Sequence, residues 1–144
     1  MSKFVDSIIG HAGGDAMGVP TEFCIREYLL RDPVKEIIGS AKTGQPAGSW
    51  SDDTSMEIAT IDSFIQNRTF NYDDIMTKWE ERINEAKYTP NNDTFDVGRT
   101  CLRAIRNHSI GTESLECGID GEQANGNGSL MRILPVALYS YYKK

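Results

Sequence analysis

Apolar residues recur at three- and four-residue intervals in several segments of this chain, and no segment of useful length alternates apolar with polar residues. The first spacing places apolar side chains on one face of a helix, whereas alternation is typical of a half-buried strand. The pattern therefore predicts an all-α fold. The chain has 144 residues, of which 39% are hydrophobic, and this composition is sufficient for the core of one domain.

The same spacing predicts where the helices lie. Six helical segments are expected. Four of them begin near Phe4, at Ser51–Thr54, at Tyr72 and at Asp96, and the other two lie near Glu27–Leu30 and over Leu130–Tyr142. Gly13-Gly14 is expected to end or bend the first helix, and Pro135 to bend the last one. Residues 15–22 are interpreted as a tight segment with an exposed backbone. The Gly-rich, polar stretch Ser109–Asn127 is interpreted as a loop.

Charge and cysteine usage limit the partners. The net charge is −6, so the chain has no general electrostatic attraction to nucleic acid or to an anionic membrane, and neither is an expected partner. The chain has three cysteines, an odd number, and none lies in a C-x-x-C pair, so neither a disulfide framework nor a zinc site is indicated. Reduced thiols in a cytoplasmic protein are the expected state. No stretch approaches the ~20 apolar residues of a membrane span. We therefore expect a soluble, cytoplasmic protein.

The segment Ser51-Asp52-Asp53-Thr54 precedes a helical apolar pattern. Taken alone, it is a capped helix start, because carboxylates stabilise the positive end of the helix dipole. The alternative is a hard-cation site, since hydroxyl and carboxylate oxygens suit Mg²⁺ or Mn²⁺. Upstream, Glu22 either is a solvated acid in a loop between helices, or lies beside this corner and orients water or a substrate hydroxyl.

Two further motifs lie downstream. The segment Asn125–Arg132 contains two Asn-Gly pairs without alternating flanks, so a glycine-rich turn that opens a helix is favoured over a hairpin. Such a turn offers backbone N–H groups to a phosphate. Arg132 either binds a phosphate or is a buried structural arginine. Asp96 in Asp-Val-Gly-Arg-Thr is, by itself, a helix cap.

Other residues receive a structural interpretation. His11 lies beside the apolar face of the first helix and is expected to be structural. The stripe formed by Tyr72, Met76, Trp79 and Ile83 is expected to be core. The acids Glu80, Glu81 and Glu85 are expected to form a solvated face.

In their joint order, the four motifs resemble those of the ADP-ribosylglycohydrolase family, and most closely its bacterial dinitrogenase reductase-activating branch. The resemblance runs through Asp15-Ala16-Met17-Gly18…Pro20…Glu22, Ser51-Asp52-Asp53-Thr54, Asp96-Val97-Gly98…Thr100 and Gly126–Arg132. It implies an orthogonal multi-helix bundle with a centre of two Mg²⁺ or Mn²⁺ ions. It also implies a hydrolase that removes ADP-ribose from a modified protein side chain, N-linked to arginine.

The resemblance assigns roles to matching positions. Ser51, Asp52 and Asp53 resemble the first set of metal ligands. Glu22 resembles the family's acidic residue near the scissile bond, and Asp96 resembles the aspartate that contacts the guanidinium side or aids catalysis. The substrate-binding residues implied are those of the loop around ADP-ribose: Gly126, Asn127, Gly128, Ser129 and Arg132.

Two departures leave alternatives open. Arg99 stands where the arginine-specific branch often has Asn, and this difference leaves the specificity for the leaving group open. The family's second ligand set, an Asp-x-Asp-Thr/Ser, has no counterpart, since no Asp or Glu follows Arg132. We therefore expect residues 1–144 to form a single partial domain, the N-terminal part of a truncated family fold. Either a complementing C-terminal chain or a homo-oligomer completes the metal site, or the chain is a non-catalytic ADP-ribose- or nucleotide-binding module or an inactive remnant.

Overall fold

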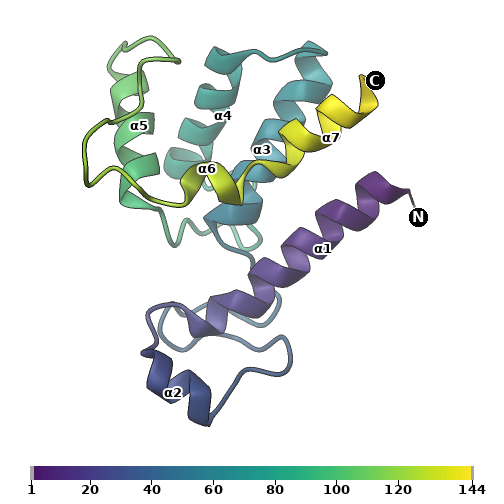
Figure 1. Cartoon of the computed structure of the whole chain (residues 1–144), viewed down its shortest axis with the longest axis vertical. Coiled ribbons are helices and arrows are strands. Elements are labelled where there is room, and N and C mark those ends of the chain that lie inside the picture. Colours follow the sequence, from purple (N-terminus) through teal and green to yellow (C-terminus); the bar gives the residue numbers. More distant parts are fainter. Residues whose placement is uncertain (1, 144) are drawn as a thin grey trace. The chain divides into compact units, whose positions relative to one another are not determined.

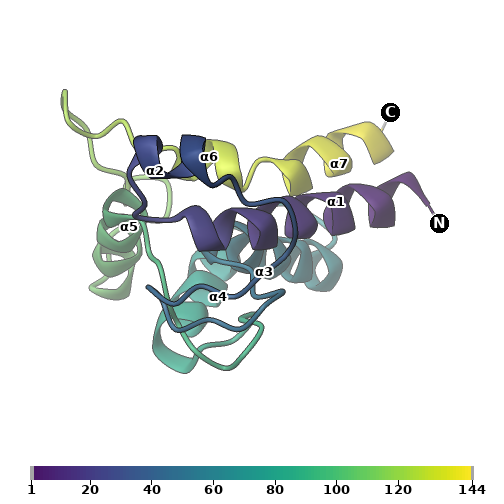
Figure 2. The same cartoon turned by 90° about the horizontal axis from the view of Figure 1, so that it is seen from below.

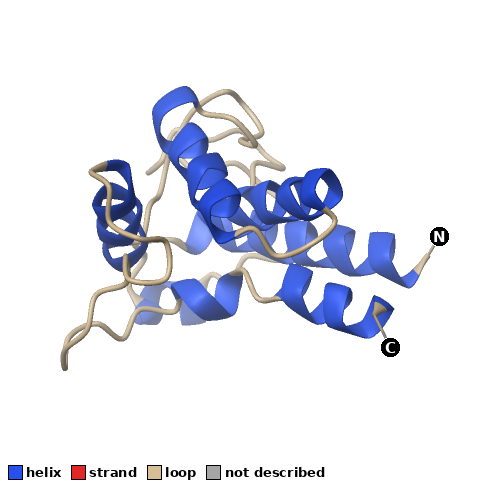
Figure 3. Ribbon diagram, turned by 90° about the horizontal axis from the view of Figure 1, so that it is seen from above, coloured by secondary structure: helices blue, strands red, loops and turns tan. Residues whose placement is uncertain are grey.

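The structure is a computed structural model that describes residues 2–143, and this part of the chain contains helices and loops but no strand (Figure 3). An isolated antiparallel bridge pairs Ser40 with Gln45. The predicted all-α class is confirmed. No helix in the described part is long and apolar enough to cross a membrane. The chain divides into two compact units, Met1–Ser51 and Asp52–Lys144, and the prediction of a single partial domain stays a prediction.

The first unit is built on helix α1, Lys3–Gly18, followed by the short 3-10 helix η1, Val19–Thr21, and helix α2, Arg26–Arg31 (Figure 1). The prediction that Gly13-Gly14 ends or bends the first helix is wrong, because α1 continues through both glycines. A glycine inside a helix costs only about 1 kcal/mol relative to alanine, which the hydrogen bonds of the surrounding turns offset. The expected tight segment at residues 15–22 therefore starts as helix.

The second unit contains α3, Asp52–Asn67, α4, Tyr72–Glu85, α5, Arg99–Ser109, α6, Gly128–Met131, and α7, Leu134–Tyr142. Helix α4 packs between α3 and α5, and α6 and α7 both contact α3 (Figure 1). The buried core of this unit comprises Met56, Met76, Cys101, Ile105 and Cys117. The chain between α5 and α6 forms turns and loop, as predicted.

The predicted apolar stripe of α4 is confirmed in three of its four members. Met76 is buried, and Trp79 and Ile83 pack against the core. Tyr72 is 49% exposed, so its assignment to the core is wrong. It is the first residue of α4, and its ring stacks on that of Phe70.

The predicted single helix over Leu130–Tyr142 is also wrong, because the chain forms two helices there (Figure 2). Helix α6 ends at Met131, and Pro135 lies in the first turn of α7. A proline lacks the backbone N–H that a helix interior requires, but the first turn of a helix leaves that group unpaired in any case. Pro135 therefore begins a helix instead of bending one.

Hydrogen bonds from Trp79 join α4 to α3. Trp79 donates from Nε1 to the carbonyl of Met56 and to Thr60 Oγ1, both at 3.2 Å.

The three acids of α4 that were predicted to form a solvated face differ from one another. Glu81 and Glu85 pair with Lys87, but Glu80 lies 2.5 Å from Nδ1 of His108 on α5. For Glu80, the expected solvated position is wrong, since it links two helices.

Asp62 on α3 gathers a second set of contacts. It pairs with Lys78 Nζ at 2.9 Å and accepts a 2.8 Å hydrogen bond from the hydroxyl of Tyr88. The hydrogen bond from Lys78 holds the pKa of Asp62 below its usual range. Because its folded-state pKa is lowered, the ionised carboxylate stabilises the fold above the ordinary carboxyl pKa, and this stabilisation is lost as the pH falls through the lowered value.

We expect Asp62→Asn to lower the free energy of unfolding at pH 7 by about 1 kcal/mol, since Asp62 is partly exposed and the pair is partly screened. The difference from wild type should shrink as the pH falls below 4. Urea denaturation at pH 7 and pH 3 measures both values. Equal stability of the two proteins at pH 7 would show that this pair does not support the fold.

Candidate functional site

The first carboxylate of α3 lies against the first residues before α5. Asp52 is buried, with 4% of its surface exposed, and its Oδ2 accepts a 3.2 Å hydrogen bond from the backbone N–H of Gly98. Gly98 is the N-cap residue of α5. An acid at the start of α3 is favoured by the helix dipole. The contact therefore fixes the beginnings of two helices beside one another.

Burial raises the pKa of Asp52 to about 6, while the hydrogen bond from Gly98 opposes this shift. The negative charges of Asp96 and Asp53 raise the pKa further, and the positive charge of Arg82 lowers it. Three acids thus interact electrostatically at one end of α3. Such an arrangement is unfavourable when all three are ionised and becomes favourable when a cation lies among them.

Asp96 is not the N-cap residue of α5, so the helix-cap interpretation of this residue is wrong. It lies two residues before Gly98 and has a φ of 45°, in the left-handed region, which aspartate tolerates better than most residues. Arg82 Nη2 donates to the carbonyls of Phe95 and Asp96, at 2.9 Å each. Gly98 is the N-cap residue instead, because the chain turns sharply at Asp96, before α5 begins.

The glycine-rich turn reaches the same end of α5. A Cβ at Gly126 would lie 3.0 Å from Thr100 Oγ1, and a Cβ at Gly128 would overlap the Sγ of Cys101. Glycine is therefore required at position 128 for close approach of the backbone. Since Thr100 and Cys101 lie two and three residues after Gly98, in the first turn of α5, the glycine-rich turn and the Asp52 carboxylate both lie at the start of this helix.

The remaining turn residues lie around this contact. Asn127 is the N-cap residue of α6, and Ser129 is exposed in its first turn. The guanidinium of Arg132 lies 4.4 Å from the centre of the Trp79 ring, and its Nη1 donates to Cys101 Sγ at 3.1 Å. Arg132 thus contacts both α4 and α5. The predicted binding of phosphate by Arg132 stays a prediction.

Two predicted residues belong to the first unit. Ser51 donates to the Asp15 carboxylate, from its backbone N–H at 3.0 and 3.1 Å and from its hydroxyl at 2.7 Å. A hydroxyl that donates in this way still offers oxygen lone pairs to a cation. Glu22 is half-buried and follows η1, where its N–H donates to the carbonyl of Val19. The predicted catalytic role of Glu22 stays a prediction.

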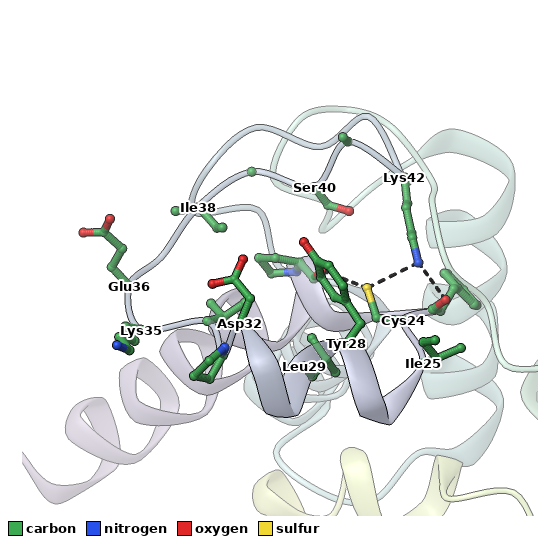
Figure 4. A pocket seen from close by; sticks show the side chains of 16 residues that line it. Cys24, Ile25, Tyr28, Leu29, Asp32, Lys35, Glu36, Ile38, Ser40 and Lys42 are labelled. Carbon is green, nitrogen blue, oxygen red and sulfur yellow. Dashed lines mark hydrogen bonds between the residues drawn. The ribbon is translucent and has the colours of Figure 1, made fainter.

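The first unit also contains a cavity of about 670 Å³ between α2 and residues 32–42 (Figure 4). Lys42 Nζ donates at its edge to the carbonyl of Phe23 and to Cys24 Sγ, at 2.8 and 3.3 Å. None of the predicted site residues lines this cavity. The candidate site is therefore the cluster in the second unit.

The side chains present fit part of a cation site. Within residues 2–143, no group of three or more His, Cys, Asp or Glu side chains is gathered closely enough to hold a metal ion by itself. Asp52 and Asp53 nevertheless supply the hard oxygen donors that Mg²⁺ and Mn²⁺ prefer, and the buried Asp52 carboxylate is destabilised in its ionised form without a cation. The Mg²⁺ or Mn²⁺ assignment stays a prediction.

Arg82 and Cys101 are residues of the site that the sequence does not indicate. Arg82 is 1% exposed although it is charged, and nothing in its spacing distinguishes it from a solvated residue of an amphipathic helix. Cys101 is one of three cysteines far apart in the sequence, and its spacing indicates no partner. Its contact with Gly128 joins residues far apart in the sequence, so only the folded chain shows it.

Comparisons with known proteins show similarity along most of the chain. A family model described as ADP-ribosylglycohydrolase matches residues 1–144. The chain is 29% identical over 136 residues to the ADP-ribosylarginine hydrolase Tri1 of Pseudomonas putida, a match that covers 92% of this chain and 35% of that protein. It is 31% identical over 138 residues to the ADP-ribosyl-dinitrogen reductase glycohydrolase of Rhodospirillum rubrum, covering 94% and 44%.

A solved structure described as an ADP-ribosylglycohydrolase-related protein complex superposes with a TM-score of 0.72 at 27% identity, covering 94% of this chain and 41% of that one. The chain thus spans 35% and 44% of the lengths of the two curated relatives above. The family match extends over the whole chain, and the predicted multi-helix fold is that of the solved relative. The chain belongs to the ADP-ribosylglycohydrolase family.

Proposed function

We propose that this chain contributes the first half of a cation-dependent site that hydrolyses the bond between ADP-ribose and a protein side chain. The observation that supports this most is the buried Asp52 carboxylate, which lies against Gly98 and interacts with Asp53 and Asp96. The two relatives above are named as hydrolases of ADP-ribosylated arginine and of ADP-ribosylated dinitrogen reductase. An ADP-ribosylated protein, modified on arginine, is the proposed substrate.

In this proposal, Asp52 and Asp53 hold Mg²⁺ or Mn²⁺ together with Ser51. The bound cation would supply Lewis acidity, which makes hydroxide available near neutral pH and fixes substrate oxygens. Three ligands from one corner fill only part of the shell of one such ion. A second copy or a complementing C-terminal segment that carries further carboxylates is therefore the proposed partner.

The bond that breaks joins the anomeric carbon of ribose to a guanidinium nitrogen, and water supplies the oxygen that replaces it. The reaction passes through an oxocarbenium-like state, as in glycoside hydrolysis generally. Asp96 and Glu22 would position the water and the leaving group, and one of them would transfer the proton that the departing nitrogen requires. The products are ADP-ribose and the unmodified side chain.

The glycine turn would hold the ADP-ribose. This turn, residues 126–129, lies close to the start of α5, and its backbone N–H groups would bind phosphate oxygens without a side chain. In a chain with a net charge of −6, this local binding replaces long-range attraction of the anionic ligand. Arg132 would add charge close to the same turn.

The coverage of the relatives favours one alternative function. Because the chain spans 35% and 44% of the two relatives named above, it could bind ADP-ribose without hydrolysing it. Calorimetric titration with ADP-ribose measures binding, and chromatography of free ADP-ribose after incubation with an ADP-ribosylated arginine peptide measures turnover. Binding without turnover supports the module, and turnover supports the enzyme.

We expect release of ADP-ribose from an ADP-ribosylated arginine peptide in the presence of Mn²⁺, either by the chain alone or after co-expression with a C-terminal segment of a family member. EDTA and the Asp52→Asn variant should each abolish the release, because both remove the cation. Chromatography of free ADP-ribose measures the product. No release by either folded preparation would contradict the proposed activity.

Asp52→Asn also has an expected effect on stability without metal. The folded-state pKa of Asp52 is raised, so the wild-type fold loses stability as the pH rises through about 6, where this carboxyl ionises. We expect the variant to gain up to about 3 kcal/mol relative to wild type between pH 4 and pH 8 in EDTA. Added Mn²⁺ should stabilise the wild type only. A wild type that gains on the variant as the pH rises in EDTA would contradict this.

Gly128→Ala should push the turn away from α5, because the new Cβ overlaps Cys101 Sγ. We expect a loss of about 1–3 kcal/mol in unfolding free energy and weaker ADP-ribose binding by calorimetry. The matched control is Gly118→Ala in the same loop, where no heavy atom lies within 4 Å of the added Cβ. Cys101→Ala should rescue Gly128→Ala, and failure of this rescue would show that the overlap is not the cause.

A further inference from the structure

Arg82 is a buried cation next to the candidate site that the proposed chemistry does not use. It lies on α4 with 1% of its surface exposed. A buried charge is costly unless hydrogen bonds and opposite charges surround it. Its position therefore requires an explanation in terms of what its guanidinium binds.

Two hydrogen bonds from the Arg82 side chain go to one short segment before α5. Its Nη2 donates to the carbonyls of Phe95 and Asp96 at 2.9 Å each. In return, the hydroxyl of Thr94 donates to the backbone carbonyl of Arg82 at 2.8 Å. The side chain and the backbone of Arg82 thus both bind residues 94–96, and this segment is fixed to α4.

This attachment fixes two groups that meet Asp52. Asp96 has a left-handed φ of 45°, a conformation that persists in a non-glycine residue when its surroundings hold it. Two residues later, the N–H of Gly98 donates to Asp52 Oδ2. A shift of the Asp96 carbonyl would therefore move both the Asp96 carboxylate and the Gly98 amide relative to Asp52.

We propose that Arg82 is a positioning residue, which holds the Asp96–Gly98 segment against Asp52 and thereby sets the cation affinity of this corner. The proposal rests on the proposed function for the cation, but the hydrogen-bond geometry carries the positioning itself. A purely electrostatic role predicts the opposite sign, because the positive charge of Arg82 repels a cation. Removal of that charge alone would tighten cation binding.

Two variants of Arg82 separate these roles. Arg82→Lys keeps the charge, but its side chain is one bond shorter than the path to Nη2, so the ammonium cannot make the same two bonds without movement. Arg82→Gln removes the charge as well. The matched control is Lys78→Gln, which removes another buried cation one turn earlier on α4, where it pairs with Asp62.

The first measurement is Mn²⁺ affinity by calorimetry on folded protein, with the folded fraction checked by circular dichroism. We expect both Arg82 variants to bind Mn²⁺ about 10–100-fold more weakly than wild type, as for other residues that orient metal ligands. Lys78→Gln should stay within about twofold of wild type, since that residue is outside the site. Unchanged binding in Arg82→Lys, or tighter binding in Arg82→Gln, would overturn the proposal, as would equal weakening by Lys78→Gln.

The second measurement does not depend on metal. Hydrogen exchange of the Gly98 amide, followed by NMR in EDTA, reports its bond to Asp52. We expect faster exchange in both Arg82 variants and no change in Lys78→Gln. If wild type binds no Mn²⁺, the proposed cation site fails, and Gly98 exchange alone then decides the positioning role. Unaltered Gly98 exchange in a folded Arg82→Lys variant would overturn that role.

Discussion

The hydrogen bond from the Gly98 amide to the buried Asp52 carboxylate is the contact on which the candidate site depends. It joins the starts of α3 and α5, two helices separated by the whole of α4 in the sequence. Burial opposes ionisation of Asp52, and the nearby acids add to this effect. A carboxylate whose ionised form is unfavourable by itself, and would become favourable with a bound cation, is typical of functional sites.

The glycine turn depends on the same helix start through contacts of a different kind. Gly128 packs on Cys101, and Arg132 bridges Cys101 and the ring of Trp79. Trp79 in turn donates to the backbone of α3. The turn, whose own residues have little apolar surface, is therefore held in place by Cys101, Trp79 and Arg132. The rigid helices supply the order that a Gly-rich segment lacks by itself.

Apolar spacing and acidic first turns are local properties, and they were sufficient to predict the helical class, the short α2 and the starts of α3 and α4. Two predictions were wrong for local reasons: α1 continues through two glycines, because a glycine costs a helix little, and Pro135 begins a helix, because the first turn does not need its N–H group. The prediction for Glu80 was wrong for a tertiary reason, because its partner His108 lies on another helix.

The order of the four motifs along the chain determined the family and the candidate residues, because residue identity and sequence spacing are sufficient for that comparison. Only the tertiary structure decided that Gly98, and not Asp96, caps α5, that Arg82 is buried against the segment before it, and that the turn at Gly128 touches Cys101. The physical reason is that a pKa shift, a buried charge and a close backbone approach arise between residues distant in sequence. None of these follows from composition or periodicity, since each depends on how helices pack.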